Sequence, residues 1–348
     1  MAEIEIAGRR IGPEHEPYVI CELSANHGGS LERALELVDA AAATGADAIK
    51  IQTYTPDTMT IDADGPDFRI EGGLWAGSTL YKLYAEAQTP FEWHAALFER
   101  AAARRVPLFS SPFDESAVDL LESLGAPAYK IASFEVVDLP LIARVARTGK
   151  PMIMSTGLAN LDEIGEAVEA ARANGCAQLV LLHCTSAYPA PVEQADVRTL
   201  ADLAHRFGCV GGLSDHTPGT AVAVAAVALG ASVVEKHFTR ARADGGPDSA
   251  FSLEPDEFSA LVRDCKDAWR ALGRVRHDRA GAEAGNAAFR RSLYIVNDVA
   301  AGEPLTAANL RSIRPGFGLP PKHLAEVLGR LAARPLKRGE RLAWDMFI

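Results

Sequence analysis

Hydrophobic residues recur along the first part of the chain as short apolar runs, and each run is followed by a longer stretch rich in Ala and Leu. Runs of four to eight apolar residues have the length of buried strands, and the stretches between them have the length of helices. We predict strands at 18–23, 47–52, 106–110, 128–131, 151–155, 178–183, 209–216 and 231–237. We predict helices at 30–43, 90–104, 114–124, 138–148, 160–174, 193–206, 220–229 and 255–272.

Eight strand–helix pairs over about 270 residues have the size and rhythm of an α/β protein of the (β/α)8, or TIM, barrel type. A doubly wound parallel sheet is the competing layout. The count of eight and the polar residues at or just beyond the strand ends favour the barrel, in which those ends converge on one face. These residues are Glu22, Lys50, Gln52, Ser110, Ser111, Lys130, Ser133, Ser155, Thr185, Ser186, Ser214, His216, Glu235 and His237. We therefore predict a barrel domain over residues 1–272.

Two stretches interrupt this rhythm. Residues 53–89 are too long for a simple connector, and their aromatic residues Tyr54, Trp75, Tyr81 and Tyr84 favour an ordered substrate lid or interface, with a peripheral insertion as the alternative. Residues 273–290 are predicted to be a linker or an interdomain helix.

Residues 291–348 are predicted to form a small, mostly β domain. A strand is expected at 292–296. Segments 301–305 and 337–342 are each predicted to form a turn followed by a strand, and both contain a Gly–Glu step, which indicates weak internal symmetry. A module of this size has little core of its own, so we expect it to dock on another surface.

Composition narrows the class of protein. The chain has 348 residues, 48% of them hydrophobic, and a net charge of −11, which argues against nucleic acid and anionic membranes as partners. No apolar run approaches the length of a membrane span, and the N-terminus is unlike a signal peptide. The five cysteines show no paired spacing, so we expect buried free thiols and a cytoplasmic location.

Two histidines are the first candidates for chemistry. His216 and His237 end the seventh and eighth predicted strands, about 20 residues apart in one strand–helix–strand unit. At neighbouring strand ends the two imidazoles could bind one divalent metal ion, with oxygen ligands completing the site. The alternative is a pair of hydrogen-bonded core histidines.

Two lysines point to an anion. Lys50 and Lys130 lie in apolar runs, where an ammonium group is costly unless it meets a negative charge. With Ser111, Ser133, Ser155 and Ser214 they suit a phosphate or carboxylate, and Glu22 and Glu235 are candidate acid–base carboxylates. A structural Lys130–Glu135 ion pair is the alternative. The glycine motifs that bind dinucleotides or ATP are absent from the sequence.

Together these residues form motifs that resemble the sialic acid synthase family: 22–28 (ELSANHG), 111–113 (SPF), 129–133 (YKIAS), 155–157 (STG), 184–189 (CTSAYP), 214–217 (SDHT) and 235–239 (EKHFT). The C-terminal module, with RSIRPG at 311–316, resembles that family's antifreeze-like (SAF) domain. Within the family, residues 51–58, 111–116 and 245–255 are most similar to the pseudaminic acid synthases.

The resemblance implies a transferase that condenses phosphoenolpyruvate and water with an amino sugar, 2,4-diacetamido-2,4,6-trideoxy-L-altrose in that branch, and releases phosphate by C–O cleavage. It implies a divalent ion, Mn²⁺ or Mg²⁺, on His216 and His237, and Glu22 and Glu235 as proton-shuttling carboxylates. It implies a phosphoenolpyruvate site of Lys50, Gln52, Ser111, Lys130, Ser133, Ser155, Ser186 and Ser214. Glu135, Tyr188 and Asp248 are expected near the sugar, and Arg314 is expected to enter the partner's barrel in a domain-swapped homodimer.

Three alternatives stay open. An N-acetylneuraminate or legionaminate synthase would run the same chemistry on another amino sugar. A metal-dependent barrel aldolase without phosphoenolpyruvate would not need the paired lysines and serines. A carbohydrate- or ice-binding protein would leave the polar residues of the barrel unexplained.

Overall fold

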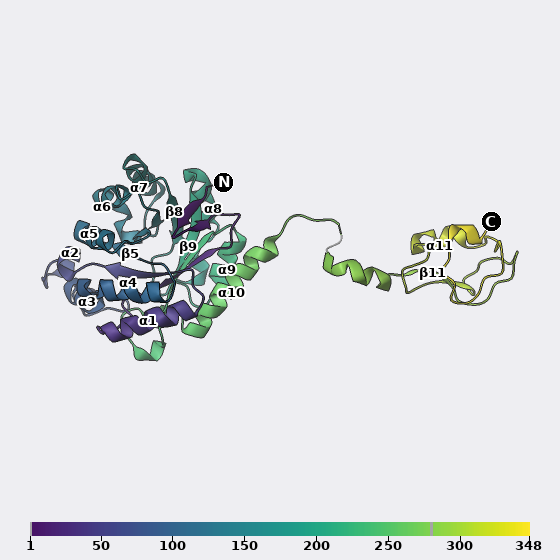
Figure 1. Ribbon diagram of the computed structural model, residues 1–348, viewed down its shortest axis with the longest axis horizontal. Helices are drawn as coiled ribbons and strands as arrows, with labels where there is room; N and C mark the ends of the chain where they lie inside the picture. The colour runs from purple at the N-terminus through teal and green to yellow at the C-terminus, as the bar shows by residue number, and fades with distance from the viewer. Residues whose placement is uncertain (1, 279–280) are drawn as a thin grey trace. The chain divides into compact units, whose positions relative to one another are not determined.

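The first part of the chain is a closed barrel of parallel strands. The computed structural model describes residues 2–278 and 281–348, and the barrel strands follow the order β10-β3-β4-β5-β6-β7-β8-β9 (Figure 1). Their bounds are β3 (Tyr18–Glu22), β4 (Ala48–Thr53), β5 (Leu108–Pro112), β6 (Tyr129–Ile131), β7 (Met152–Ser155), β8 (Leu179–Cys184), β9 (Val210–Asp215) and β10 (Val233–His237). The predicted TIM barrel is confirmed, since each predicted strand overlaps an observed one.

Helices pack around the barrel between its strands. They are α1 (Leu31–Ala43), α4 (His94–Ala103), α5 (Glu115–Ser123), α6 (Leu139–Ala146), α7 (Leu161–Ala173), α8 (Thr199–Phe207), α9 (Ala221–Ala228) and α10 (Pro255–Leu272). Local sequence sets several of their starts: the side chains of Ser30, Asp114 and Asn160 accept hydrogen bonds from the first-turn N–H groups of α1, α5 and α7.

A hairpin that the sequence pattern did not predict closes the amino end of the barrel. β1 (Ile4–Ile6) and β2 (Arg9–Ile11) pair antiparallel, and Ile4, Ile6 and Ile11 pack with residues at the strand starts such as Tyr18 and Val233. Strands of three residues are too short to give a periodic signal, which explains why the pattern missed them.

Adjacent glycines let β9 approach its neighbours. A Cβ at Gly212 would collide with the carbonyl oxygen of Val233 on β10, and one at Gly211 would lie 2.8 Å from the Cβ of Ala204 on α8. Only glycine fits these two positions, and the close β9–β10 contact brings together the strand ends that carry His216 and His237.

The stretch 53–89 is ordered and partly helical. It contains α2 (Pro56–Met59), η1 (Pro66–Phe68) and α3 (Leu80–Ala87), none of which the pattern predicted, and η2 (Phe91–Trp93) follows it. Tyr54 is buried and meets Tyr84 and Phe113 edge-on, with ring centroids 5.8 and 5.2 Å away. The order expected from its aromatic residues is present, and its role as a lid stays a prediction.

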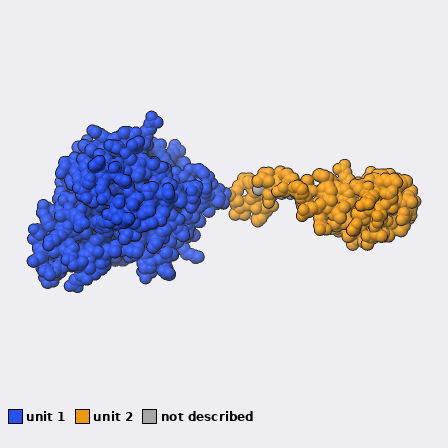
Figure 2. Space-filling model, turned by 90° about the horizontal axis from the view of Figure 1, so that it is seen from below, with its two compact units in different colours: residues 1–273 blue, residues 274–348 orange. Residues whose placement is uncertain are grey.

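The chain divides into two compact units, Met1–Gly273 and Arg274–Ile348 (Figure 2). The second unit contains η7 (Gly281–Phe289), β11 (Ser292–Ile295), β12 (Leu310–Ile313), η8 (Pro321–His323), α11 (Leu324–Val327) and η9 (Trp344–Met346), with β11 and β12 antiparallel. Within the described residues, no helix is both long and apolar enough to cross a bilayer.

The two Gly–Glu segments of the second unit fold alike, as their sequence similarity indicated. Glu303 accepts a hydrogen bond from the N–H of Ala300 at 2.8 Å, and Glu340 accepts one from the N–H of Lys337 at 2.6 Å. Gly302 and Gly339 both have positive φ, +79° and +94°. Each segment forms an isolated bridge, Pro304 with Leu331 and Arg341 with Tyr294, instead of the regular strand that we predicted.

Candidate functional site

The carboxyl ends of the barrel strands bring the predicted polar residues to one mouth. Parallel register places Glu22 of β3 opposite Lys50 of β4 and also opposite His237 of β10. On the adjoining strands Gln52 lies opposite Ser111. In a barrel these ends form the face where barrel enzymes carry out their chemistry.

Lys50 lies at the centre of a buried charged network. Its Nζ is 2.9 Å from Oε2 of Glu22 and 3.6 Å from Oε1 of Glu235, and it donates a hydrogen bond to Oγ of Ser111 at 3.3 Å. Gln52 donates to Oε1 of Glu22 at 2.9 Å. The ammonium group therefore lies within ion-pair distance of two carboxylates.

Lys130 joins the same network from β6. Its Nζ lies 3.6 Å from Oε1 of Glu235, which also accepts a hydrogen bond from Ser214 at 3.2 Å. The ion pair of Lys130 is therefore with Glu235, not with the alternative partner Glu135. Oε2 of Glu235 is buried and has no hydrogen-bond partner among the described residues, so this oxygen is available to a bound molecule.

The two carboxyl groups have pKa values shifted in opposite directions. Burial raises the pKa of Glu22 above its usual value, against the opposing charge of Lys50. Burial would also raise the pKa of Glu235, but Lys130 and Lys50 outweigh it and hold the pKa below its usual value. Two neighbouring carboxyl groups whose pKa values are shifted apart suit different acid–base roles. Glu22 is the one that keeps its proton to higher pH.

Glu135, in the turn η3 (Ser133–Val137) after β6, makes stability depend on pH. Burial raises its pKa from 4.5 to about 7. The protonated side chain therefore adds to the free energy of unfolding below pH 4.5, and this contribution is lost as the pH rises through 7. Glu135→Gln should therefore stabilise the protein by about 3 kcal/mol above pH 8 relative to the parent, and little at pH 4. Urea unfolding across pH measures this, with Glu169→Gln on the exposed face of α7 as control. An equal effect at pH 4 and pH 8 would contradict it.

A group of hydroxyls surrounds Gly157 beside the lysines. Ser133 accepts a hydrogen bond from the N–H of Gly157 at 3.2 Å, and a Cβ at Gly157 would collide with Oγ of Ser186. Oγ of Ser155 is buried without a hydrogen-bond partner among the described residues. In the sequence Gly157 looks like an ordinary turn residue. In the structure its lack of a side chain allows these hydroxyl groups to lie close together.

His216 and His237 lie together on the other side of the mouth, with ring centroids 5.3 Å apart. Nδ1 of His216 is 3.0 Å from the carbonyl oxygen of Thr185, and Nδ1 of His237 is 3.2 Å from Oγ of Ser24. Burial, with the charge of His216 adding to it, lowers the pKa of His237 well below its usual value, which keeps its ring neutral.

The arrangement of this pair is compatible with the divalent ion that the sequence predicts, and the metal site stays a prediction. A carbonyl oxygen can only accept, so His216 carries a proton on Nδ1, and in its neutral form the Nε2 lone pair is available to a metal ion. Anchoring of the distal nitrogen by a carbonyl or hydroxyl is typical of metal-binding histidines. Within residues 2–278 and 281–348 no group of three or more His, Cys, Asp or Glu side chains is arranged for a metal, so oxygens of substrate and water would have to complete the coordination.

Aromatic rings form a wall beside the two histidines. The Tyr188 ring lies 4.4 Å from His216, 5.3 Å from Phe251 of η6 (Ser249–Phe251), and 6.0 Å from Trp75 of the long insertion. Asp248 lies next to this wall and accepts a hydrogen bond from the N–H of Ala25 at 3.4 Å. Sequence reasoning placed Tyr188 and Asp248 here but did not find Phe251 or this position for Trp75.

Cys184 is a further residue that the sequence did not single out. It is one of five free, buried cysteines, as expected from their spacing. Its Sγ lies 3.7 Å from Nδ1 of His216 and 3.7 Å from Oγ of Ser186. Cys184 therefore lies between the cluster of serine hydroxyls around Gly157 and the histidine pair.

Arg314 belongs to the second unit, where it is exposed directly after β12. Its expected entry into a partner's barrel stays a prediction.

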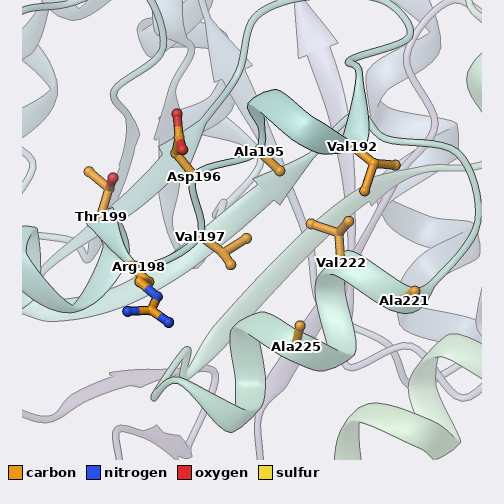
Figure 3. Close-up of a pocket in the computed structure, with 9 residues that line it drawn as sticks. All are labelled: Val192, Ala195, Asp196, Val197, Arg198, Thr199, Ala221, Val222 and Ala225. Atoms are coloured by element: carbon orange, nitrogen blue, oxygen red, sulfur yellow. The ribbon is translucent and has the colours of Figure 1, made fainter.

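A hollow of about 600 Å³ lies between η4 (Val192–Gln194), the start of α8 and α9 (Figure 3). Its lining is mostly aliphatic, with the polar side chains of Asp196, Arg198 and Thr199 on one side. None of the predicted site residues lines it, so it is separate from the chemistry of the mouth.

Comparison with known proteins assigns the class. Residues 37–277 match the NeuB family and residues 290–348 match the SAF domain. The chain therefore belongs to the NeuB family.

Several relatives of this chain carry the names of individual enzymes within the family. The chain is 45% identical to a pseudaminic acid synthase of Campylobacter jejuni, over 93% of this chain and 95% of that one. It is 43% identical to that of Helicobacter pylori (94% and 97%) and 34% identical to an N,N'-diacetyllegionaminic acid synthase of Legionella pneumophila (94% and 94%). The crystal structure of an N-acetylneuraminic acid synthetase from Leptospira borgpetersenii has a TM-score of 0.73 at 29% identity, covering 82% of this chain and 94% of that one.

Proposed function

We propose that this protein is a pseudaminic acid synthase, which condenses phosphoenolpyruvate and water with 2,4-diacetamido-2,4,6-trideoxy-L-altrose to give pseudaminic acid and phosphate. The identity to relatives of that name is 43–45%, against 34% for the legionaminic acid branch. The observation that carries the chemistry is the buried network of Lys50, Lys130, Glu22 and Glu235 beside the histidine pair. An aldolase that does not use phosphoenolpyruvate would not need Lys50 and Lys130, which form the cationic half of the mouth, opposite the histidine half.

The cationic half is proposed to bind phosphoenolpyruvate. Lys50 and Lys130 supply positive charge to its phosphate and carboxylate, and hydroxyl groups that can donate hydrogen bonds lie around them. The proposed hydroxyl donors are Ser111, Ser133, Ser155, Ser186 and Ser214, and the side-chain amide of Gln52 is a further donor. The unpartnered Oγ of Ser155 supports this assignment, because a buried hydroxyl is normally hydrogen-bonded.

The histidine half is proposed to bind the open-chain sugar. His216 and His237 would hold Mn²⁺ or Mg²⁺, which when bound supplies Lewis acidity toward the sugar aldehyde. Tyr188 and Asp248, which lie beside the histidines, and Glu135 are proposed to bind the hydroxyl and acetamido groups. The enol carbon of phosphoenolpyruvate forms the new C–C bond, water adds to the adjacent carbon, and phosphate leaves with the C–O bond.

The carboxyl groups are proposed to move the protons. Glu22, whose pKa is raised by burial, is the proposed proton donor. Glu235, held ionised by the two lysines, can accept one from the attacking water. Both lie within the same network, so a proton released on one side need not pass through bulk solvent.

Phosphate release with three sugars in parallel tests the proposal: the diacetamido-trideoxy-altrose, its legionaminate counterpart and N-acetylmannosamine, each with phosphoenolpyruvate and Mn²⁺. We expect turnover with the first sugar at a kcat/KM at least about tenfold above the others, the scale of one or two differing polar contacts. Preference for another sugar would keep the chemistry and reject this substrate, whereas no release with any sugar would reject the synthase.

Arg314 is proposed to complete the mouth of a partner subunit in a domain-swapped homodimer. Arg314→Ala and Glu22→Gln should each lose most activity alone. Co-expressed, they should recover about a quarter of the parent activity, since half of the dimers are mixed and one of the two sites in each is intact. No recovery from a confirmed mixed dimer would contradict the exchange.

A further inference from the structure

Ser24 has a backbone conformation that is unusual for its residue type. It directly follows β3, is 2% exposed and has φ +40°, in the left-handed region that favours glycine. It lies in a tight turn in which the N–H of Asn26 donates to the carbonyl oxygen of Leu23 at 3.2 Å. Strain of this kind persists where the surroundings require it and concentrates at functional sites.

The turn is fastened to the strand that carries His237. The side-chain amide of Asn26 donates to the carbonyl oxygen of Phe238 at 2.7 Å and to Oγ of Ser252 at 2.9 Å. The hydroxyl of Ser24 is thereby held between Nδ1 of His237, at 3.2 Å, and the carboxyl group of Asp248, with which it is also hydrogen-bonded.

The chemistry of these three groups fixes where the protons lie. The hydrogen bond between Ser24 and Asp248 uses the single O–H of Ser24, which donates to a carboxyl oxygen. The oxygen of Ser24 must then accept from His237, which puts the imidazole proton on Nδ1. The Nε2 lone pair of His237 is left free, as it is for His216, whose Nδ1 faces the carbonyl oxygen of Thr185.

We propose that Ser24 is a positioning residue that selects the tautomer and the orientation of His237 for binding a divalent ion. Its strained backbone is the cost of placing the hydroxyl between His237 and Asp248. This inference rests on the proposed metal role of the two histidines and adds a residue that is expected neither to contact the ion nor to react.

Two substitutions separate the hydroxyl from the backbone. Ser24→Gly removes the hydroxyl and the strain, whereas Ser24→Ala removes the hydroxyl and keeps the strain. Both should weaken Mn²⁺ binding by about 10-fold or more, the effect usual for the outer partner of a metal ligand. Only the alanine variant should lower the thermal midpoint, and the glycine variant should melt no lower than the parent. A residue that merely supported the fold would lower affinity and midpoint together.

The test titrates Mn²⁺ alone into the metal-stripped full chain, followed by electron paramagnetic resonance of the free ion. Arg105→Gly is the matched control, because Arg105 also has positive φ, +58°, but is exposed between α4 and β5, at the amino end of the barrel. It should leave Mn²⁺ affinity unchanged. Long-range ¹H–¹⁵N spectra of the metal-free protein should give His237 as the Nδ1–H tautomer in the parent and as a mixture in Ser24→Gly.

Unchanged Mn²⁺ affinity in both Ser24 variants would overturn the inference, and so would a parent protein that does not bind Mn²⁺ at all. The proposed function fails separately: a parent that binds Mn²⁺ through Ser24-dependent His237 but releases no phosphate from phosphoenolpyruvate would reject the synthase and support the positioning role.

Discussion

Glu22→Gln is expected to lower kcat for phosphate release by about 10²–10⁴-fold, the usual contribution of a positioned acid or base. The amide keeps the shape of the side chain but cannot transfer a proton. KM for phosphoenolpyruvate should change by much less, because Lys50 keeps its second contact with Glu235. Steady-state kinetics at saturating sugar measure both constants.

The fold should tolerate this change. Gln keeps the shape of the side chain, and Lys50 keeps its ion pair with Glu235, so the thermal midpoint should stay close to that of the parent. Glu122→Gln makes the same chemical change in a partly exposed ion pair with Lys150 and should leave kcat unchanged. A Glu22→Gln protein that is folded and retains parental kcat would remove Glu22 from the proton-transfer steps.

Lys236→Met is expected to destabilise the protein by about 3–5 kcal/mol, because it leaves the buried carboxylate of Asp215 without its ion-pair partner. Lys236 and Asp215 are both 1% exposed and form an ion pair of 2.6 Å, and Lys236 also donates to the carbonyl oxygen of Thr217 at 2.6 Å. The two residues directly precede His237 and His216 and point to the other side of their strands, so the pair ties β9 to β10 behind the histidines.

Urea unfolding of two further variants checks the cause. Replacing Lys236 by Met and Asp215 by Leu together should cost less than Lys236→Met alone, since the double change leaves no unpaired buried charge. Lys150→Met breaks an ion pair of the same 2.6 Å length with Glu122, but its side chains are 28% and 37% exposed, and it should cost only about 0–1 kcal/mol. Equal losses from the buried and the exposed pair would contradict the argument.

The strand ends explain why so much of the mouth could be predicted. In a parallel barrel every strand ends at the same face, so a polar residue at the end of an apolar run must lie there, whatever the details of packing. Glu22, Lys50, Glu235 and the two histidines follow this rule, and their motifs identify the family. Arg314 lies outside the rule because it belongs to another unit.

The sequence did not predict which side chains at the mouth form ion pairs and hydrogen bonds with one another. Glu135 is five residues from Lys130, and the sequence offers them as a pair, yet Lys130 pairs with Glu235 from the other side of the barrel. Ser24, Gly157 and Cys184 are small residues next to recognised ones, and nothing in their type separates them from ordinary turn or core residues. Their roles follow from contacts between strands that are far apart in the chain.

The sequence by itself determined the barrel, the order of its strands and helices, and the family, because periodicity and strand-end chemistry are local properties of the chain. Only the tertiary structure decided which charges neutralise one another, which hydroxyl orients which histidine and which glycines allow close approach. These depend on distances of a few ångströms across the barrel, and the spacing of residues along a chain does not contain them.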